Sequence, residues 1–439
     1  MSLGLSGIYS IRTTGRSYVE ETLAAHVLGF INVEGKAIGG VEEFYDDVLR
    51  GKQGKLRYRK DNRGVMISDP QQFVPPEDGD HLVLTLDRRI QQLTEDALDK
   101  GMNKYQPRHA TAIVVDPQTG EVLAMANRPT YNPNQFAQTW KSGVNDRNIA
   151  VQNQYEPGST FKIVTLAAAI EEGKFDAQAL FTSGSIKVED RIIRDWNHEG
   201  WGRITYREGV LQSSNVAFVH LGKRLGAEKL SAYIEKFGFG QLTERRGRPT
   251  GIDLPGEGSG IFFGAKKLHP SELATTSFGQ GIAVTPIQQV MAVAAIANGG
   301  TLYQPYVVKE IRDSGSKQPR KVNKPKVVGK VVSEKTATQV RNLLYDTVRY
   351  GTGKGAAVKG YSVAGKTGTA QKPAEGGGYA AGRYFLSFIG FAPVEHPRVV
   401  VYVALDDPQV GGLTGGTAAA PIAGEIIEGA MQVLNVKSQ

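Results

Sequence analysis

The rest of this chain is best understood from Tyr155-Glu156-Pro157-Gly158-Ser159-Thr160-Phe161-Lys162 and the apolar run 163–170 that follows it. Pro157 and Gly158 indicate a turn, and the good helix formers after them predict a helix. Ser159 and Lys162 are three residues apart, so on a helix both side chains lie on one face, with Cβ atoms about 5–6 Å apart. The Lys162 amine would then lie near the Ser159 hydroxyl at a helix N-terminus, where negative charge that develops on the serine oxygen is stabilised.

Two further stretches contain residue types that suit the same chemistry. A Ser-x-x-Lys pair alone is commonly an N-cap and a solvated lysine, so it needs a context. Ser213-Ser214-Asn215 stands between two helical patterns, and Lys366-Thr367-Gly368-Thr369 lies on an expected strand where glycine leaves room for close approach to the backbone. Each is commonplace alone. In this order the three match the S-x-x-K, S-D-N and K-T-G signature of serine β-lactamases and penicillin-binding proteins, with Ser214 in the middle of the second motif.

The wording around these motifs resembles class B penicillin-binding proteins, the monofunctional D,D-transpeptidases of cell division, elongation and sporulation. The resemblance rests on Tyr155–Lys162, Ser213–Phe218, Gly351-Thr352-Gly353, Gly365–Gln371 and the early segment Arg16–Gly54. It implies an α+β fold in which a transpeptidase domain, residues 79–439, combines an antiparallel sheet with helices and an all-helical subdomain. A partial, non-catalytic pedestal domain of the dimerisation type would occupy residues 1–78.

The resemblance also implies a mechanism. Ser159 would attack the carbonyl of a D-Ala-D-Ala stem peptide and form an acyl-enzyme, which divides one hard step into two easier ones. Lys162 can act as a base only when neutral, so burial or a second cation must lower its pKa. Lys366 is the expected second cation, and it would also attract the substrate carboxylate. A β-lactam antibiotic would acylate the same serine.

Further roles follow from the resemblance alone. Ser213 would relay protons with Lys162, and Asn215 would hold the peptide amide. Thr367 and Thr369, on either side of Gly368, would bind the terminal carboxylate. The N–H groups of Ser159 and Thr369 would form an oxyanion hole, worth about 3–4 kcal/mol per donor. The mechanism needs no metal and no cofactor.

Other functions compete with transpeptidation. A class A β-lactamase uses a glutamate for deacylation, and no Glu-x-x-Leu-Asn segment follows residues 213–215. A D,D-carboxypeptidase stays open, because the shape of the cleft decides between water and an amine as acceptor. A β-lactam sensor or wall-binding module without transpeptidation stays open as well. The seven histidines show no metal-ligand spacing, and residues 351–355 lack the ending of a phosphate loop.

Composition limits where such a protein works and what it binds. The chain has 439 residues, a net charge of +8 and no cysteine, which favours an anionic environment and excludes disulfides and thiol chemistry. The basic residues are scattered and no nucleic-acid-binding motif accompanies them, so we expect no nucleic-acid partner. No run of about 18 apolar residues is present. By resemblance, we expect a soluble piece of an envelope protein whose missing anchor holds it on the outer face of the cytoplasmic membrane, beside a membrane glycosyltransferase.

Patterns elsewhere predict the surrounding elements. Asp116-Pro117-Gln118-Thr119-Gly120 is a turn between strands 110–115 and 121–126, and later strands are expected at 361–369, 385–391 and 399–404. Early and late strands would share one sheet with helices on one side. Helices are expected at 20–28, 39–49, 86–105, 206–211, 216–225, 227–237, 286–297, 333–350 and 417–434. Residues 171–203 look irregular, with Trp196 and Trp201 as anchors on the core and His198 as a loop residue.

Overall fold

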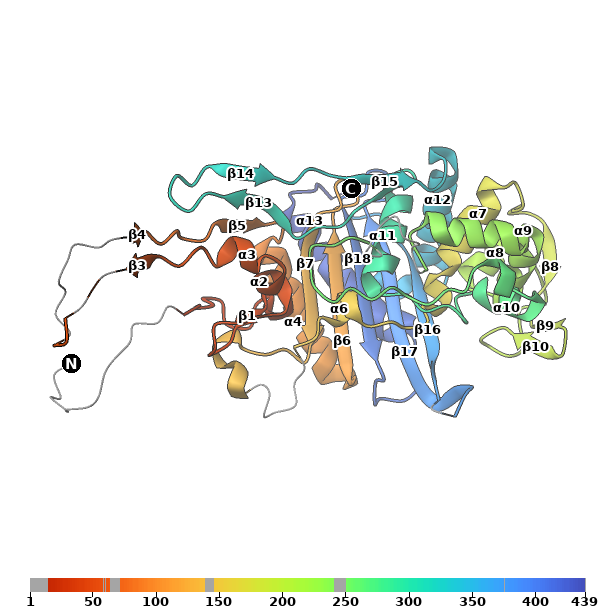
Figure 1. Cartoon of the computed structure of the whole chain (residues 1–439). Helices are drawn as coiled ribbons and strands as arrows, with labels where there is room; N and C mark the ends of the chain where they lie inside the picture. The colour runs from red at the N-terminus through yellow and green to blue at the C-terminus, as the bar shows by residue number, and fades with distance from the viewer. Residues whose placement is uncertain are drawn as a thin grey trace.

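The computed structural model describes residues 15–57, 59, 61–63, 72–138, 146–240, 250–374 and 376–438 (Figure 1). Its centre is a five-stranded antiparallel sheet in the order β16-β17-β18-β6-β7. These strands are β6 (His109–Val115), β7 (Val122–Arg128), β16 (Ala364–Pro373), β17 (Tyr379–Ala392) and β18 (Val399–Asp406). The early β6 pairs with the late β18, with Ala404 opposite Thr111. The prediction that early and late strands share one sheet is confirmed, and β16 is an edge strand.

Helices cover both faces of this sheet, so the expectation of helices on one side was wrong. Along β18, Val401, Val403 and Leu405 belong to one buried cluster with α4 (Arg88–Tyr105) and α13 (Ala420–Val433). The alternate residues Val400, Tyr402 and Ala404 belong to a second cluster with α7 (Lys162–Glu171) and α11 (Pro286–Ala297). A strand that is apolar at every position must be buried on both faces. The apolar run of β18 therefore already indicated that both faces of the sheet are covered.

The helices next to the sheet largely agree with the helices predicted from the sequence. It contains α8 (Tyr206–Leu211), α9 (Asn215–Lys236), α10 (Pro270–Thr276) and α12 (Glu334–Tyr350). Gly226, with φ of 77°, interrupts α9 between the two expected helical patterns. Residues 171–203 are not irregular, because they include β8 (Leu180–Thr182), β9 (Ser185–Val188) and β10 (Arg191–Arg194), while β11 (Arg203–Thr205) pairs with β8. Trp196 is 56% exposed and is therefore not the core anchor that we expected.

The N-terminal part is built from short elements. They are α1 (Ala25–Leu28), β1 (Phe30–Ile31), β2 (Ala37–Ile38), α2 (Gly40–Phe44), α3 (Asp46–Leu49), β3 (Lys55–Arg57) and β4 (Gln72–Val74). The helices expected at 20–28 and 39–49 are shorter or divided, since residues 19–24 form turns and Tyr45 separates α2 from α3. Figure 1 shows β3 and β4 extending away from the central sheet. The alternation of Leu56 and Tyr58 with Arg57 and Arg59 predicts a strand after Gly54. Its first residues are in β3, and Tyr58 lies outside the described residues.

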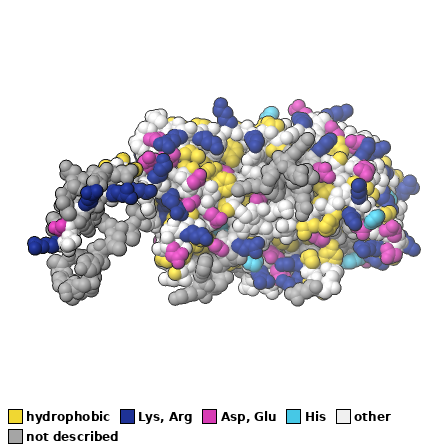
Figure 2. All heavy atoms as spheres, viewed as in Figure 1, with side chains coloured by type: hydrophobic (Ala, Val, Ile, Leu, Met, Phe, Trp, Pro, Cys, Tyr) yellow, Lys and Arg dark blue, Asp and Glu magenta, His cyan; other side chains and the backbone are white. Residues whose placement is uncertain are grey.

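A second, three-stranded sheet joins distant parts of the sequence. In it, β13 (Val308–Arg312) lies between β5 (His81–Leu84) and β14 (Pro319–Val322). The remaining elements are β12 (Thr301–Tyr303), β15 (Val327–Lys330), α6 (Ile149–Gln152), η1 (Pro133–Gln135), η2 (Gly158–Thr160), η3 (Ala265–Lys267), η4 (Lys354–Ala356) and η5 (Gly415–Ala419). On the face shown in Figure 2, Lys and Arg side chains are interspersed with Asp and Glu. That pattern gives this face no continuous basic stripe.

Candidate active site

Ser159 lies in the short 3-10 turn η2, and α7 begins at Lys162. The sequence predicted one helix that contains both residues, whereas the structure places the serine one tight turn before the α-helix, which is a common way for helices to begin. Gly158 has φ of 53°, in the left-handed region that glycine adopts without strain. Its N–H donates to the carbonyl of Gly279 at 2.9 Å. The hydrogen bond thereby ties the turn to Gly279.

The edge strand β16 packs closely against this turn. A Cβ added to Gly158 would lie 3.1 Å from Cβ of Ala370, and one added to Gly368 would lie 3.1 Å from Cγ2 of Thr160. Gly158 therefore faces Ala370, and Thr160 faces Gly368. In the chain, Ser159 stands between Gly158 and Thr160, and Thr369 stands between Gly368 and Ala370. Gly368 is needed because its added Cβ would also lie only 2.3 Å from Oγ of Ser387.

Lys162 points into a polar pocket formed by the joint between α8 and α9. Its Nζ lies 2.8 Å from the carbonyl oxygen of Ser213, 3.2 Å from Oγ of Ser213 and 2.7 Å from Oδ1 of Asn215. The side chain is buried, and the ring of Phe218 lies 5.3 Å from its Nζ. Within the described residues Lys162 has no hydrogen bond to Ser159, so these contacts hold the amine while the serine hydroxyl stays available.

Lys366 reaches the same hydroxyl from β16. Its Nζ donates to Oγ of Ser213 at 2.8 Å and to the carbonyl of Thr367 at 3.1 Å. Ser213 itself is buried and has φ of 58°, an uncommon value for a residue with a side chain. Two lysines from distant parts of the sequence thus meet at one serine oxygen. Backbone strain at such a position is typical of functional sites.

The two buried lysines are easily deprotonated. Burial lowers the pKa of Lys162 well below its usual value, and the positive charge of Lys366 lowers it further, while Asp195 raises it. Burial alone lowers the pKa of Lys366 to about 7. A neutral Lys162 amine has two N–H groups, which can donate to the Ser213 carbonyl and to the Asn215 amide oxygen. It also has one lone pair, which can accept a proton. The lowered pKa of Lys162 and its observed contacts are therefore compatible with a neutral amine that acts as a base.

The remaining predicted residues lie around the same centre. Thr367 Oγ1 donates to Thr352 Oγ1 at 3.1 Å, and Thr369 Oγ1 accepts from the Gly415 N–H at 3.1 Å. The structure therefore brings all three sequence motifs together. Two neighbours were given no role from the sequence: Thr352, noted there only as part of Gly351-Thr352-Gly353, and the buried Asp195, which accepts a hydrogen bond from Ser214 at 2.8 Å. Only the folded chain places these two residues beside the motifs.

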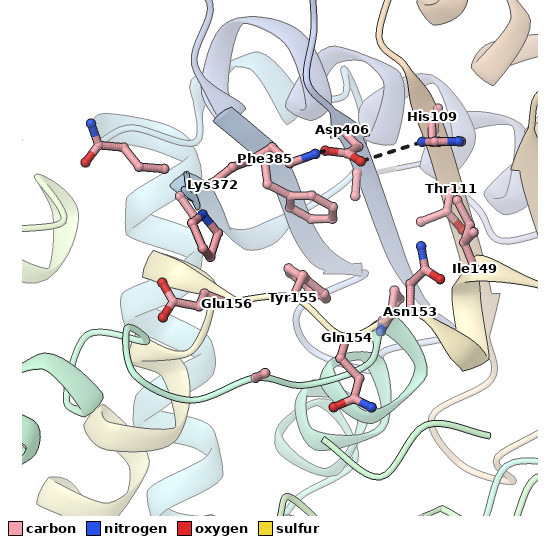
Figure 3. Close-up of a pocket in the computed structure, with 17 residues that line it drawn as sticks. His109, Thr111, Ile149, Asn153, Gln154, Tyr155, Glu156, Lys372, Phe385 and Asp406 are labelled. Carbon is pink, nitrogen blue, oxygen red and sulfur yellow. Dashed lines mark hydrogen bonds and ion pairs between the residues drawn. The ribbon is translucent and has the colours of Figure 1, made fainter. Parts of the chain in front are cut away.

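A cavity of about 230 Å³ lies beside the nucleophile turn (Figure 3). Tyr155 and Phe385 line it with stacked rings whose centroids are 4.2 Å apart. Asp406 lies between Lys372, at 2.5 Å, and His109, at 3.6 Å, on its far wall. Ser159 does not line this cavity. The cavity is therefore next to the turn that carries Ser159 and separate from the predicted reaction centre.

In the part of the chain that the structure describes, no group of three or more His, Cys, Asp or Glu side chains is arranged to hold a metal ion. Within the same residues, no helix combines the length and the apolar character needed to cross a bilayer.

An antiparallel sheet whose edge strand faces a Ser-x-x-Lys turn and a Ser-x-Asn joint defines the class of serine acyl-transfer proteins that contains penicillin-binding proteins and serine β-lactamases. The family model described as the penicillin binding protein transpeptidase domain matches residues 110–428, and the model of the penicillin-binding protein dimerisation domain matches residues 1–84. The chain belongs to the penicillin-binding protein transpeptidase family. The expected α+β fold and the resemblance seen in the sequence are confirmed.

Individual relatives agree with this assignment. Stage V sporulation protein D of Bacillus subtilis is 44% identical over 439 residues, which cover 99% of this chain and 67% of the relative. Peptidoglycan D,D-transpeptidase FtsI of Escherichia coli is 32% identical over 438 residues, which cover 99% of this chain and 70% of the relative. Crystal structures of penicillin binding protein 3 from Mycobacterium tuberculosis, in the apo-form and with aztreonam, match with TM-scores of 0.84 and 0.85 at 33% identity, over 96% of this chain and 91% of theirs.

The depressed pKa of Lys366 predicts a dependence of stability on pH. The folded chain releases this proton near pH 7, whereas the unfolded chain keeps it up to about 10.5. Between these values the unfolded state binds more protons, so the free energy of unfolding rises with pH, by at most about 1.4 kcal/mol per unit. Denaturant melts at pH 7.5 and 9.5 should show a smaller rise for Lys366→Met than for the wild type. The exposed Lys359→Met is the control, and equal slopes in all three proteins would contradict the prediction.

Proposed function

We propose that this protein is a peptidoglycan D,D-transpeptidase that cross-links stem peptides through an acyl-enzyme on Ser159. The observation that carries the proposal is the meeting of Lys162 and Lys366 at the Ser213 hydroxyl, next to the Ser159 turn. Further support comes from relatives named as D,D-transpeptidases and from the similar penicillin binding protein 3, whose structures contain aztreonam or ampicillin. β-Lactam antibiotics are accordingly the expected covalent inhibitors.

The residues take the following parts in acylation. Neutral Lys162 removes the proton of the Ser159 hydroxyl while the oxygen attacks the carbonyl of the penultimate D-Ala. The carbonyl oxygen gains negative charge and accepts hydrogen bonds from the N–H groups of Ser159 and Thr369. Preorganised donors of this kind lower a barrier by about 3–4 kcal/mol each. The C–N bond then breaks, and the terminal D-Ala leaves with the proton.

Protons reach the leaving amine through Ser213. Lys366, Ser213 Oγ and Lys162 form a continuous chain with links of 2.8 and 3.2 Å. Once Lys162 holds the proton of Ser159, it can donate a proton to Ser213 Oγ while Ser213 donates its own proton to the leaving amine, which returns Lys162 to its neutral form. Lys366 with Thr367 and Thr369 binds the substrate carboxylate, Gly368 leaves room for the peptide, and Asn215 holds its amide. Deacylation by the amine of a second stem peptide completes the cross-link.

An assay with peptidoglycan strands that carry D-Ala-D-Ala pentapeptides tests this proposal. We expect cross-linked dimers and one released D-Ala for each bond, and neither product with Ser159→Ala. Released D-Ala without dimers would identify a D,D-carboxypeptidase. A stable penicillin adduct with no product from the strands would identify a sensor or wall-binding module. Either of these outcomes would contradict the transpeptidase.

We also propose the division of the chain into a pedestal domain, residues 1–78, and a transpeptidase domain, residues 79–439. The matches of the two family models to residues 1–84 and 110–428 support this division. Pairing of β5 with β13 supports a boundary before residue 81, because it attaches β5 to a strand of the second domain. We also propose that the protein works on the extracytoplasmic face of the cytoplasmic membrane, beside a membrane glycosyltransferase that supplies the glycan strands.

A further inference from the structure

Asp195 is a buried carboxylate at the end of the β9–β10 hairpin, and it is only 1% exposed. Its Oδ1 accepts from Oγ of Ser214 at 2.8 Å and from the N–H of Val216 at 3.1 Å. Its Oδ2 accepts from the N–H of Gly184 at 2.8 Å. All three partners are donors, so the site requires a group that only accepts hydrogen bonds. An ionised carboxylate meets this requirement, whereas an amide does not.

These contacts act on the joint that carries Ser213 and Asn215. Ser214, which lies between them, also caps α9 by accepting from the N–H of Ala217 at 3.1 Å. In addition, Asn215 Nδ2 donates to the carbonyl of Arg194 at 2.9 Å. The end of the hairpin therefore holds residues 214–216, and the side chains that contact Lys162 come from the same joint. A change at Asp195 would therefore be transmitted to Ser213 and Asn215 through the backbone of residues 214–216, which Asp195 holds in place.

Asp195 also contributes charge. The charged groups that act on Lys162 are Lys366 from β16, which lowers the pKa of Lys162, and Asp195, which raises it against the dominant effect of burial. From α9 the aromatic ring of Phe218 faces the amine. Within the described residues Asp195 is thus the anion that opposes Lys366 at the Lys162 amine.

We propose that Asp195 is a positioning residue for acylation: its carboxylate fixes the Ser213–Asn215 joint and balances the charge around Lys162. The inference rests on the proposed function, because it concerns the reaction of Ser159. Asp195 touches neither Ser159 nor the place of the substrate. It acts on the geometry and on the protonation of the groups that do.

The test is the pH dependence of the second-order rate constant for acylation by a fluorescent penicillin. Asp195→Asn keeps the shape but turns an N–H donor toward either Gly184 or the pair Ser214 and Val216. We expect a rate constant lower by about 100-fold, since a misplaced catalytic group costs about that much. Because the loss of an anion makes the Lys162 ammonium less stable, the rise of the rate with pH should also move to lower pH.

A matched control is Asp190→Asn in the turn of the same hairpin, where the side chain is exposed. It should have the rate constant and pH profile of the wild type. A merely structural role for Asp195 would let water reach Lys162 and move the profile to higher pH. That outcome, an unmoved profile, or a rate constant within twofold of the Asp190→Asn protein would overturn the proposal.

A second variant covers the case in which Asp195→Asn does not fold. Ser214→Ala removes one contact to the carboxylate and keeps its charge, so the rate constant should fall at least about 10-fold while the pH profile stays in place. An unchanged rate constant would overturn the positioning role. Acylation of the wild type is the reference in both experiments. Failure of the wild type to react would reject the proposed function, whereas normal reaction of all variants would reject only the role of Asp195.

Discussion

Replacing Ser159 with alanine is expected to abolish covalent labelling by penicillin completely. The serine Oγ is the atom that forms the ester in the proposed mechanism, and alanine offers no atom in its place. The change is small, and the side chain is only partly buried, so the fold should survive. Labelling followed by proteolysis and mass spectrometry of the peptides should locate the adduct on Ser159 in the wild type.

The control for this experiment is Ser185→Ala on β9, where the serine is exposed. It should label like the wild type. An adduct on another residue, or continued labelling of Ser159→Ala, would show that a different nucleophile forms the ester. A thermal melt of both variants separates loss of the nucleophile from loss of the fold.

Replacing Lys162 with alanine is expected to lower the rate constant of acylation by about 10²- to 10⁴-fold, the usual contribution of a general base. The residue is buried, and its pKa is lowered well below the usual value by burial and by Lys366. Removing an amine that the interior does not stabilise as a cation should leave the fold intact. The measurement is stopped-flow acylation with a fluorescent penicillin at pH 7.5, together with circular dichroism.

Lys174→Ala provides the matched control, because Lys174 follows the same helix and its side chain is exposed. It should react at the rate of the wild type. Normal acylation of Lys162→Ala would eliminate Lys162 as the base and direct attention to Lys366. A slow rate accompanied by an altered circular dichroism spectrum would attribute the loss to the fold.

Much of the architecture could be predicted because local sequence patterns determine many of its turns, helices and strands. The Asp116–Gly120 turn, the helical periodicity of α4 and the continuous apolar strands all depend on a few neighbouring residues. The 3-10 turn at Ser159 could not be predicted, since it depends on Gly279 and on β16, which are distant in the sequence. The hairpins of residues 180–205 were missed for a similar reason. Their strands are only three or four residues long, too short for a clear alternation.

By itself the sequence determined which side chains are available for the reaction, namely two serines (Ser159 and Ser213) and two lysines (Lys162 and Lys366) within three ordered motifs. It also determined the apolar strands that form the sheet. The chemical type of each side chain can be read directly from the sequence, and the hydrophobic periodicity that predicts a strand depends only on neighbouring residues. Only the tertiary structure decided that Lys162 and Lys366 meet at Ser213, that the turn carrying Ser159 packs against β16, and that Asp195 holds the Ser213–Asn215 joint. Distances between segments far apart in the chain, and the burial that lowers the pKa of each lysine, exist only after the sheet and helices have packed.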